Sequence, residues 1–137
     1  YIAFYKWHIN EYIMIRKASL VYLTELHYNK LKKYFPEDKY LKKELKAEGF
    51  KFGVFLDDKL IYCFIVCYGN NPKSAYIAHL YTDGSFEAKR IMIKVLRMFN
   101  ELHKDWFVVF VSRKPYLFKN RCKEIKMYTY QYTGCLI

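Results

Sequence analysis

Residues 75–90 read AYIAHLYTDGSFEAKR, and within this stretch the pattern changes from that of a strand to that of a helix. Residues 75–82 are rich in aromatic and apolar side chains, as strands are. Gly84 breaks this pattern, and Ser85 is of a type that commonly caps the start of a helix. Apolar residues then recur at helical spacing over 86–103. The sequence therefore predicts a strand, a tight turn and a long helix. The expected inner face of that helix holds Ile91, Met92, Val95, Phe99 and Leu102, and its outer stripe holds Arg90, Lys94 and Arg97.

A hairpin pattern precedes this stretch. Residues 50–56 and 60–68 are strongly apolar, and the polar triplet Asp57-Asp58-Lys59 separates them. Two apolar runs joined by so short a polar link predict two antiparallel strands. The polar segment 69–73 contains Gly and Pro, and it predicts a turn into the next strand.

The N-terminal third predicts one strand and two helices. Residues 12–16 are apolar enough for a strand. Ser19 is expected to cap a first helix that runs to Pro36, and a second helix is expected from there to Gly49, with Leu41 and Leu45 inward.

The C-terminal third predicts a further strand at 106–111, buried on both faces because it is uniformly apolar. A short helix at 115–122 and a last strand at 125–133 follow. We therefore expect an α/β (α+β) fold: a mixed, mostly antiparallel central sheet flanked by about four helices. The 137 residues suit one domain, with 1–11 as an N-terminal extension whose true start is missing, since the first residue is not Met.

The composition restricts the function classes. The formal net charge is +11, which favours polyanionic partners such as nucleic acid, acidic proteins or CoA-type phosphates. The four cysteines form no C-x-x-C pair, and Cys63 and Cys67 stand in an apolar run, so we expect reduced thiols in a cytoplasmic protein. No apolar stretch is long enough for a membrane span. The histidines and cysteines show no metal-ligand spacing, so no metal site is expected.

The order of elements resembles that of the GNAT superfamily of N-acetyltransferases. Ile15-Arg16-Lys17-Ala18 looks like the family's opening strand, and residues 52–61 are similar to its meander hairpin. Residues 75–82 with the following helix resemble its acyl-CoA-binding strand and helix, and residues 117–121 resemble its last short helix. The resemblance covers roughly residues 12 to 133.

This resemblance implies roles for particular residues if the fold is active with acetyl-CoA. His79 would act as general base and Tyr116 as general acid. The acyl donor would contact Leu80, Tyr81, Gly84 and Ser85, and its phosphates or a partner would contact Arg90, Lys94 and Arg97. Some of these residues also have a structural interpretation. His79 would then be a half-buried histidine of a strand, Ser85 a helix cap, and the basic stripe a solvated helix face.

The chain departs from the family pattern where the diphosphate of CoA would bind. The family's loop between strand and helix reads R/Q-x-x-G-x-G/A, whereas only one glycine, Gly84, remains here. Asp83 and Glu87 would repel phosphate, and Phe86 is bulky. Phe118 aligns with the usual tyrosine acid, and Tyr116 supplies a hydroxyl only with a register two residues away.

Three functions remain open from the sequence. The first is a catalytically degenerate domain without a cofactor, acting through a protein partner or self-assembly. It would be similar to small GNAT-like proteins of tailed bacteriophages, with a role in virion morphogenesis or host interaction. The second is an active acetyl-CoA-dependent N-acetyltransferase. The third is a basic nucleic-acid-binding module, suggested by the charge and the many aromatic residues.

Overall fold

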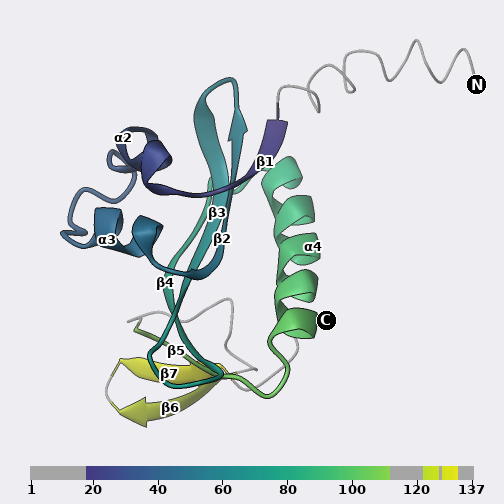
Figure 1. Ribbon diagram of the computed structural model, residues 1–137. Helices are drawn as coiled ribbons and strands as arrows, with labels where there is room; N and C mark the ends of the chain where they lie inside the picture. Colours follow the sequence, from purple (N-terminus) through teal and green to yellow (C-terminus); the bar gives the residue numbers. More distant parts are fainter. Residues whose placement is uncertain (1–17, 112–121, 127, 133–137) are drawn as a thin grey trace, which may run out of the picture.

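A computed structural model describes residues 18–111, 122–126 and 128–132 of the chain. Seven strands form one sheet in the order β1-β2-β3-β4-β5-β7-β6 (Figure 1). All neighbouring strands are antiparallel except β4 and β5, which are parallel. The predicted fold class, a mixed and mostly antiparallel sheet with flanking helices, is confirmed. The strands are β1 (Ala18–Tyr22), β2 (Gly49–Leu56), β3 (Lys59–Tyr68), β4 (Ser74–Thr82), β5 (Phe107–Val111), β6 (Cys122–Lys126) and β7 (Thr129–Tyr132).

The helices cover both faces of this sheet. A 3-10 turn η1 (Glu25–His27) leads into α2 (Tyr28–Leu31), and α3 (Leu41–Lys46) follows. Figure 1 shows α2 and α3 on one face and the long helix α4 (Phe86–Leu102) on the other. The described residues thus contain three α-helices, somewhat fewer than the four expected. None of these helices has the length and apolarity that crossing a bilayer would require.

Strand β3 lies between two hydrophobic cores. Tyr62, Phe64 and Val66 face α4, where Phe64 packs edge-on against Phe99. The alternating residues of β3 face α2 and α3; they are Cys63, Ile65 and Cys67. A strand buried on both faces explains the uniformly apolar sequence of this segment. Cys63 and Cys67 are free thiols within it, as the sequence predicted.

Strand β4 pairs with β3 along nearly its whole length but with β5 only at its start. Only Ser74–Tyr76 pair with β5, opposite Phe107–Val109. On its other edge, β4 contains a bulge: Ile65 pairs with His79 and Val66 with Ile77, so Ala78 has no opposite residue. The sheet therefore splays between β4 and β5, and the C-terminal half of β4 continues away from β5 toward the start of α4 (Figure 1).

The structure corrects the start of the chain. Ser19 does not cap a helix; it lies in β1 opposite Phe55 of β2. Hydrogen bonding along the edge of β2 prevails over the helical spacing of the leucines, and Leu20 is 50% exposed. Thr24 is the true N-cap, since its side chain accepts from the N–H of Leu26. The strand expected at 12–16 lies outside the described residues.

Other boundaries also differ. Helix α3 starts at Leu41 rather than Pro36, although Leu41 and Leu45 point inward as predicted. Leu102, expected in the core, is 62% exposed because it occupies the last turn of α4.

The C-terminal strands also differ from the prediction. Strand β5 alternates between buried and exposed residues and is not buried on both faces. The expected last strand is a hairpin of β6 and β7. The short helix at 115–122 falls mostly outside the described residues, and Cys122, at its end, begins β6.

Candidate functional site: the end of β4 and the start of α4

The turn between β4 and α4 is held by hydrogen bonds to its own chain. The N–H of Asp83 donates to the carbonyl of Ile61 at 2.9 Å, which fixes the turn to β3. Gly84 then adopts a φ of +82°, a left-handed conformation that glycine reaches without strain. Apart from its two chain neighbours, none of the described residues has an atom within 4 Å of the position that a Cβ on Gly84 would take, so the described residues leave the turn sterically open there.

The backbone donors of this turn already have acceptors. The N–H of Gly84 donates to Thr82 Oγ1 at 3.1 Å, and that of Ser85 donates to Asp83 Oδ1 at 2.9 Å. The Ser85 hydroxyl accepts from the N–H of Ala88 at 3.2 Å, so Ser85 is the N-cap of α4. A carboxylate of the chain itself thus accepts from the Ser85 N–H, which is one of the donors that an external anion would need at this helix start.

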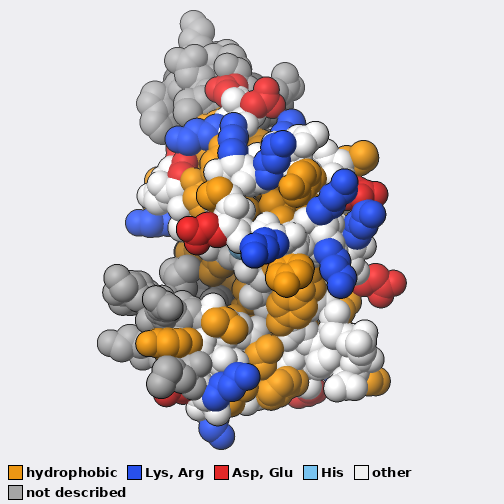
Figure 2. Space-filling view, turned by 90° about the vertical axis from the view of Figure 1, so that its left-hand side faces the viewer, with side chains coloured by type: hydrophobic (Ala, Val, Ile, Leu, Met, Phe, Trp, Pro, Cys, Tyr) orange, Lys and Arg blue, Asp and Glu red, His pale blue; other side chains and the backbone are white. Residues whose placement is uncertain are grey.

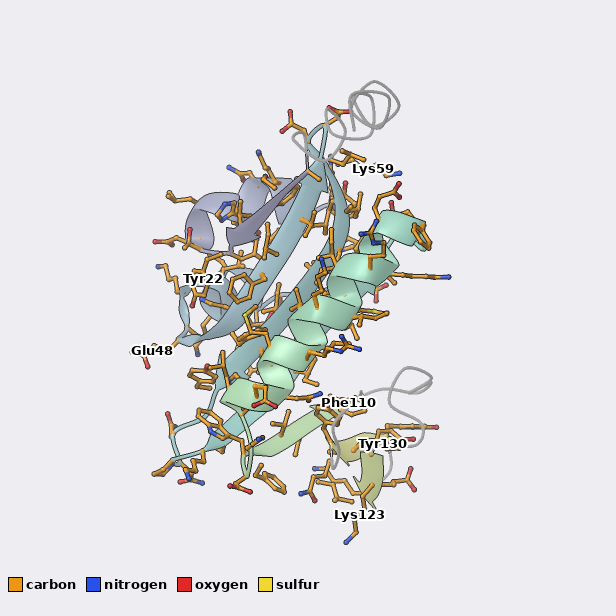
Figure 3. All side chains as sticks on the ribbon, turned by 90° about the vertical axis from the view of Figure 1, so that its right-hand side faces the viewer. Tyr22, Glu48, Lys59, Phe110, Lys123 and Tyr130 are labelled. Carbon is orange, nitrogen blue, oxygen red and sulfur yellow. The ribbon has the colours of Figure 1, made fainter. Side chains whose placement is uncertain are left out.

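The charge of Asp83 is stabilised in this position. Burial acts to raise its pKa, but the hydrogen bonds from Ser85 and the charge of Lys59 outweigh burial, and the pKa lies below its usual value. Figure 3 shows Lys59, at the tip of the β2–β3 hairpin, at the same end of the molecule as the start of α4. Asp83 is therefore ionised at neutral pH, and it brings a negative charge to the helix start.

The outer face of α4 carries the predicted basic stripe. Arg90, Lys94 and Arg97 are all exposed. Phe86 is 70% exposed, and the guanidinium of Arg90 lies 5.8 Å from the centre of its ring. The bulk of Phe86 suggested from the sequence that its side chain fills the turn. The structure shows that it does not, because the side chain is exposed.

His79 faces the opposite side of the sheet, toward α2 and α3. Its Nε2 atom lies 2.5 Å from Oδ2 of Asp38 and 3.3 Å from Oε1 of Glu44. The Phe35 ring stacks on the imidazole, with ring centres 4.1 Å apart. These three polar residues form what we call the Asp38–Glu44–His79 cluster, and their side chains are between 12% and 17% exposed.

Opposing effects set the pKa values in this cluster. Burial lowers the pKa of His79, but the hydrogen bonds and charges of Glu44 and Asp38 outweigh it, so the pKa is raised. Burial raises the pKa of Glu44, and the neighbouring Asp38 adds to this. Burial acts in the same direction on Asp38, yet hydrogen bonds from Glu44, His79 and the Tyr40 backbone hold its pKa below the usual value. The imidazole is thus stabilised in its charged form.

The remaining predicted site residues are divided between the two faces. Leu80 packs into the core on the α4 side, whereas Tyr81 packs on the other side with Tyr34, ring centres 5.4 Å apart. The structure therefore brings together Gly84 and Ser85, but it separates Leu80 from His79 and Tyr81. Tyr116 and Phe118 lie outside the described residues.

The sequence interpretation missed both carboxylates of the cluster. Asp38 follows Pro36-Glu37 and had the pattern of a helix start, and Glu44 lies on a helix otherwise rich in exposed lysines. An acidic residue one position before the inward-facing Leu45, within a run of lysines, was the available signal.

Comparison with solved structures identifies the architecture. A probable acetyltransferase from Staphylococcus epidermidis matches with a TM-score of 0.56 and 11% identity, over 84% of this chain and 95% of that one. Arabidopsis thaliana Naa50 in complex with the bisubstrate analogue CoA-Ac-MVNAL matches with a TM-score of 0.61 and 10% identity, over 84% and 95%. The PaiA N-acetyltransferase from Thermoplasma acidophilum in complex with coenzyme A matches with a TM-score of 0.56 and 13% identity, over 85% and 99%.

The chain has a GNAT-like fold. In this chain the sheet splays between β4 and β5, β4 contains a bulge, and the long helix α4 follows it. No protein-family model matches the sequence, and no curated protein is significantly similar to it. At these low identities the likeness establishes the fold alone.

Proposed function

We propose that this chain is a GNAT-fold binding protein in which the acyl-donor site no longer functions. The observation that carries this proposal is the bond between Asp83 and the Ser85 N–H at 2.9 Å. In solved structures of this fold, CoA or a CoA analogue is bound. A diphosphate at the start of α4 would have to displace the ionised Asp83 carboxylate and accept the hydrogen bond of the Ser85 N–H in its place.

The residues at the start of α4 do not fit such a cofactor. Asp83 is ionised, and Glu87 adds a second acidic residue in the first turn of the helix. Two carboxylates oppose the binding of a doubly charged diphosphate. Since the described residues leave the space above Gly84 open, the obstacle that we propose is electrostatic.

His79 is poorly suited to the role of general base. A base must be neutral to accept a proton, and the two carboxylates beside His79 favour its protonated form. It is also engaged with Asp38 and stacked against Phe35. We therefore favour the structural interpretation of this histidine in the proposed binding protein.

The face formed by α2 and α3 is the better candidate for a functional surface. Figure 2 shows Lys and Arg side chains around exposed hydrophobic side chains on this face. Tyr40 is 66% exposed and Leu26 is 89% exposed. Lysines lie over aromatic rings here, for example Lys32 and Lys42 over Tyr28 at 5.9 and 5.8 Å. Aromatic and basic groups together suit an acidic protein surface. The exposed lysines of this segment are Lys30, Lys32, Lys33, Lys39, Lys42, Lys43 and Lys46.

Calorimetric titration with acetyl-CoA and with CoA tests the loss of the donor site. We expect no saturable binding at millimolar cofactor, and no release of CoA in the presence of amine acceptors. Saturable binding at micromolar concentration would refute the proposal. Size-exclusion chromatography with light scattering then tests the binding role: a candidate acidic partner should co-elute, less so in high salt, and self-assembly would instead appear as a mass above that of one chain.

The biological setting that we propose follows from the resemblance to phage GNAT-like proteins. A partner in virion morphogenesis or in the host cell would fit a binding role for a basic chain. Genes for phage structural proteins next to the gene of this chain would support this setting, and a purely metabolic neighbourhood would speak against it.

Active N-acetyl transfer is the alternative function. The splay beyond Tyr76 of β4 favours it, since a donor chain could lie along the unpaired edge of the strand. A water molecule would then have to serve as the base. Steady acetylation of an amine, abolished on competition with a bisubstrate analogue, would establish this alternative in place of the binding role.

Nucleic-acid binding is the second alternative, and the same basic face would serve it. Its affinity for single-stranded DNA or RNA should fall steeply with salt, because lysines that neutralise phosphates release counterions. Affinity independent of salt would contradict this function.

A further inference from the structure

The Asp38–Glu44–His79 cluster has the composition of a metal-binding site. Its three residues come from the turn before α3, from α3 itself and from β4. Each offers one ligand atom, and these atoms all lie within 4.8 Å of one another. One imidazole nitrogen and two carboxylate oxygens are ligands that zinc takes in sites with three protein groups and a solvent molecule.

One oxygen in the cluster has no hydrogen-bond donor. Oε1 of Glu44 is inaccessible to solvent, and within the described part of the chain no donor meets it with the geometry of a hydrogen bond. The Nε2 atom of His79 can donate only one hydrogen, and its nearest acceptor is Asp38 at 2.5 Å. Glu44 Oε1, at 3.3 Å from the same nitrogen, is left without a partner and points into the cluster. A buried carboxylate oxygen in this state is costly unless something positive meets it.

The charges in the cluster also leave a deficit. Two carboxylates face a single imidazole, which can neutralise one of them. A divalent cation bound to a neutral imidazole and two carboxylates would remove the deficit completely.

The distances are compatible with a cation. Ligand atoms about 2.0–2.2 Å from a tetrahedral zinc ion lie about 3.3 Å apart. The separation of His79 Nε2 from Glu44 Oε1 is already 3.3 Å. The 2.5 Å contact with Asp38 is a hydrogen bond, and it must lengthen by under about 1 Å when the metal replaces the proton.

The surroundings hold the ligands in place. Phe35 stacks on the His79 ring and fixes its plane. The thiol of Cys67 donates to the backbone carbonyl of Glu44 at 3.7 Å. Cys67 therefore supports α3 through this hydrogen bond, and its sulfur does not belong to the group of converging ligand atoms.

We propose that Asp38, Glu44 and His79 bind one divalent transition-metal ion, for which Zn²⁺ is the natural probe, and that this ion fastens α3 and the preceding turn to β4. Such a site is independent of whether the chain retains acyl transfer. The nitrogen ligand favours zinc over Mg²⁺ and Ca²⁺, which prefer all-oxygen sites.

Calorimetric titration of the chelator-treated protein with ZnCl₂ tests the site. We expect one ion per chain, a melting temperature that rises with zinc concentration, and no comparable response to MgCl₂ or CaCl₂. Glu44→Gln and Asp38→Asn keep side-chain size and should each weaken zinc binding at least about tenfold. Glu37→Gln removes an exposed carboxylate one residue from Asp38, and it should leave the affinity unchanged.

Cobalt substitution provides the second readout. Co²⁺ should give visible absorption bands in the wild type that disappear in His79→Gln, without the intense thiolate band that a cysteine ligand produces. The proposal is overturned if zinc does not bind saturably, if both carboxamide variants bind like the wild type, or if a thiolate band appears. Melting in the absence of metal confirms that each variant is folded.

Discussion

The ammonium group of Lys51, on β2, donates a hydrogen bond of 2.6 Å to the carbonyl oxygen of Leu45, in the last turn of α3. It also donates to the carbonyl of Ala47. Lys51 is only 2% exposed, and its ammonium lies 5.4 Å from the centre of the Tyr22 ring. Burial lowers its pKa, yet the helix-end carbonyls give its charge a favourable position.

Replacement of this lysine should therefore destabilise the fold. Lys51→Met keeps roughly the length of the side chain but leaves two carbonyl groups without their donor, that of Leu45 in α3 and that of its C-cap Ala47. We expect a loss of about 1–3 kcal/mol in the free energy of unfolding, measured by urea denaturation. Lys43→Met, at an exposed position of α3, is the control and should change stability by less than about 0.5 kcal/mol. Equal effects of the two substitutions would show that the buried hydrogen bonds do not matter.

The burial of Lys51 could not be predicted from the sequence. A lysine within an apolar strand gives no sign that its side chain will be buried, because its partners lie on a helix that precedes it in the chain. The same is true of Asp38 and Glu44, which meet His79 only after α3 has packed against β4. Contacts between segments that are distant in sequence leave no local pattern.

Elements with a strong local pattern were predicted well. The Asp57-Asp58 turn, with φ values of 50° and 64°, and the strands beside it follow from residue type alone. The prediction that Ser19 caps a helix was wrong for the opposite reason, since pairing with β2 prevailed over the local helical pattern. The GNAT-like order of elements could thus be predicted from the sequence, while the state of the site could not.

Ser85 should contribute to stability as the N-cap of α4. Ser85→Ala removes the acceptor for the Ala88 N–H and should lower the free energy of unfolding by about 1 kcal/mol. Ser85→Asp restores a capping oxygen and should recover most of this loss. Chemical denaturation of the three proteins provides the measurement, and equal stability of the Ala and Asp variants would contradict the capping role.

His103 should make the protein less stable as the pH falls. Its Nδ1–H donates to the carbonyl of Phe99 at 2.8 Å, so the neutral ring accepts from the Tyr68 hydroxyl through Nε2, also at 2.8 Å. Burial lowers its pKa, and the hydrogen bond to Phe99 only partly opposes this. Below a pH of about 6.5 the unfolded chain takes up a proton that the folded chain does not, so unfolding becomes more favourable.

The contribution of this histidine is isolated by comparison with a variant. His103→Gln should show a shallower fall in melting temperature between about pH 7 and pH 5 than the wild type does. Other titrating groups affect both proteins equally. Parallel curves for the two proteins would mean that the pKa of His103 is not depressed in the folded state.

Substitution of Asp83 tests directly why the turn before α4 rejects a diphosphate. Asp83→Asn removes the charge but keeps an oxygen for the Ser85 N–H, whereas Asp83→Gly removes both the charge and the acceptor. Loss of the charge should raise CoA affinity from wild type to Asn, and release of the Ser85 N–H should raise it further in Gly, by at least about tenfold overall, or about 1.4 kcal/mol. Calorimetry with CoA measures each step. A wild type that binds CoA as tightly as Asp83→Gly would show that the carboxylate does not close the site, and the preference for a binding role would lose its basis.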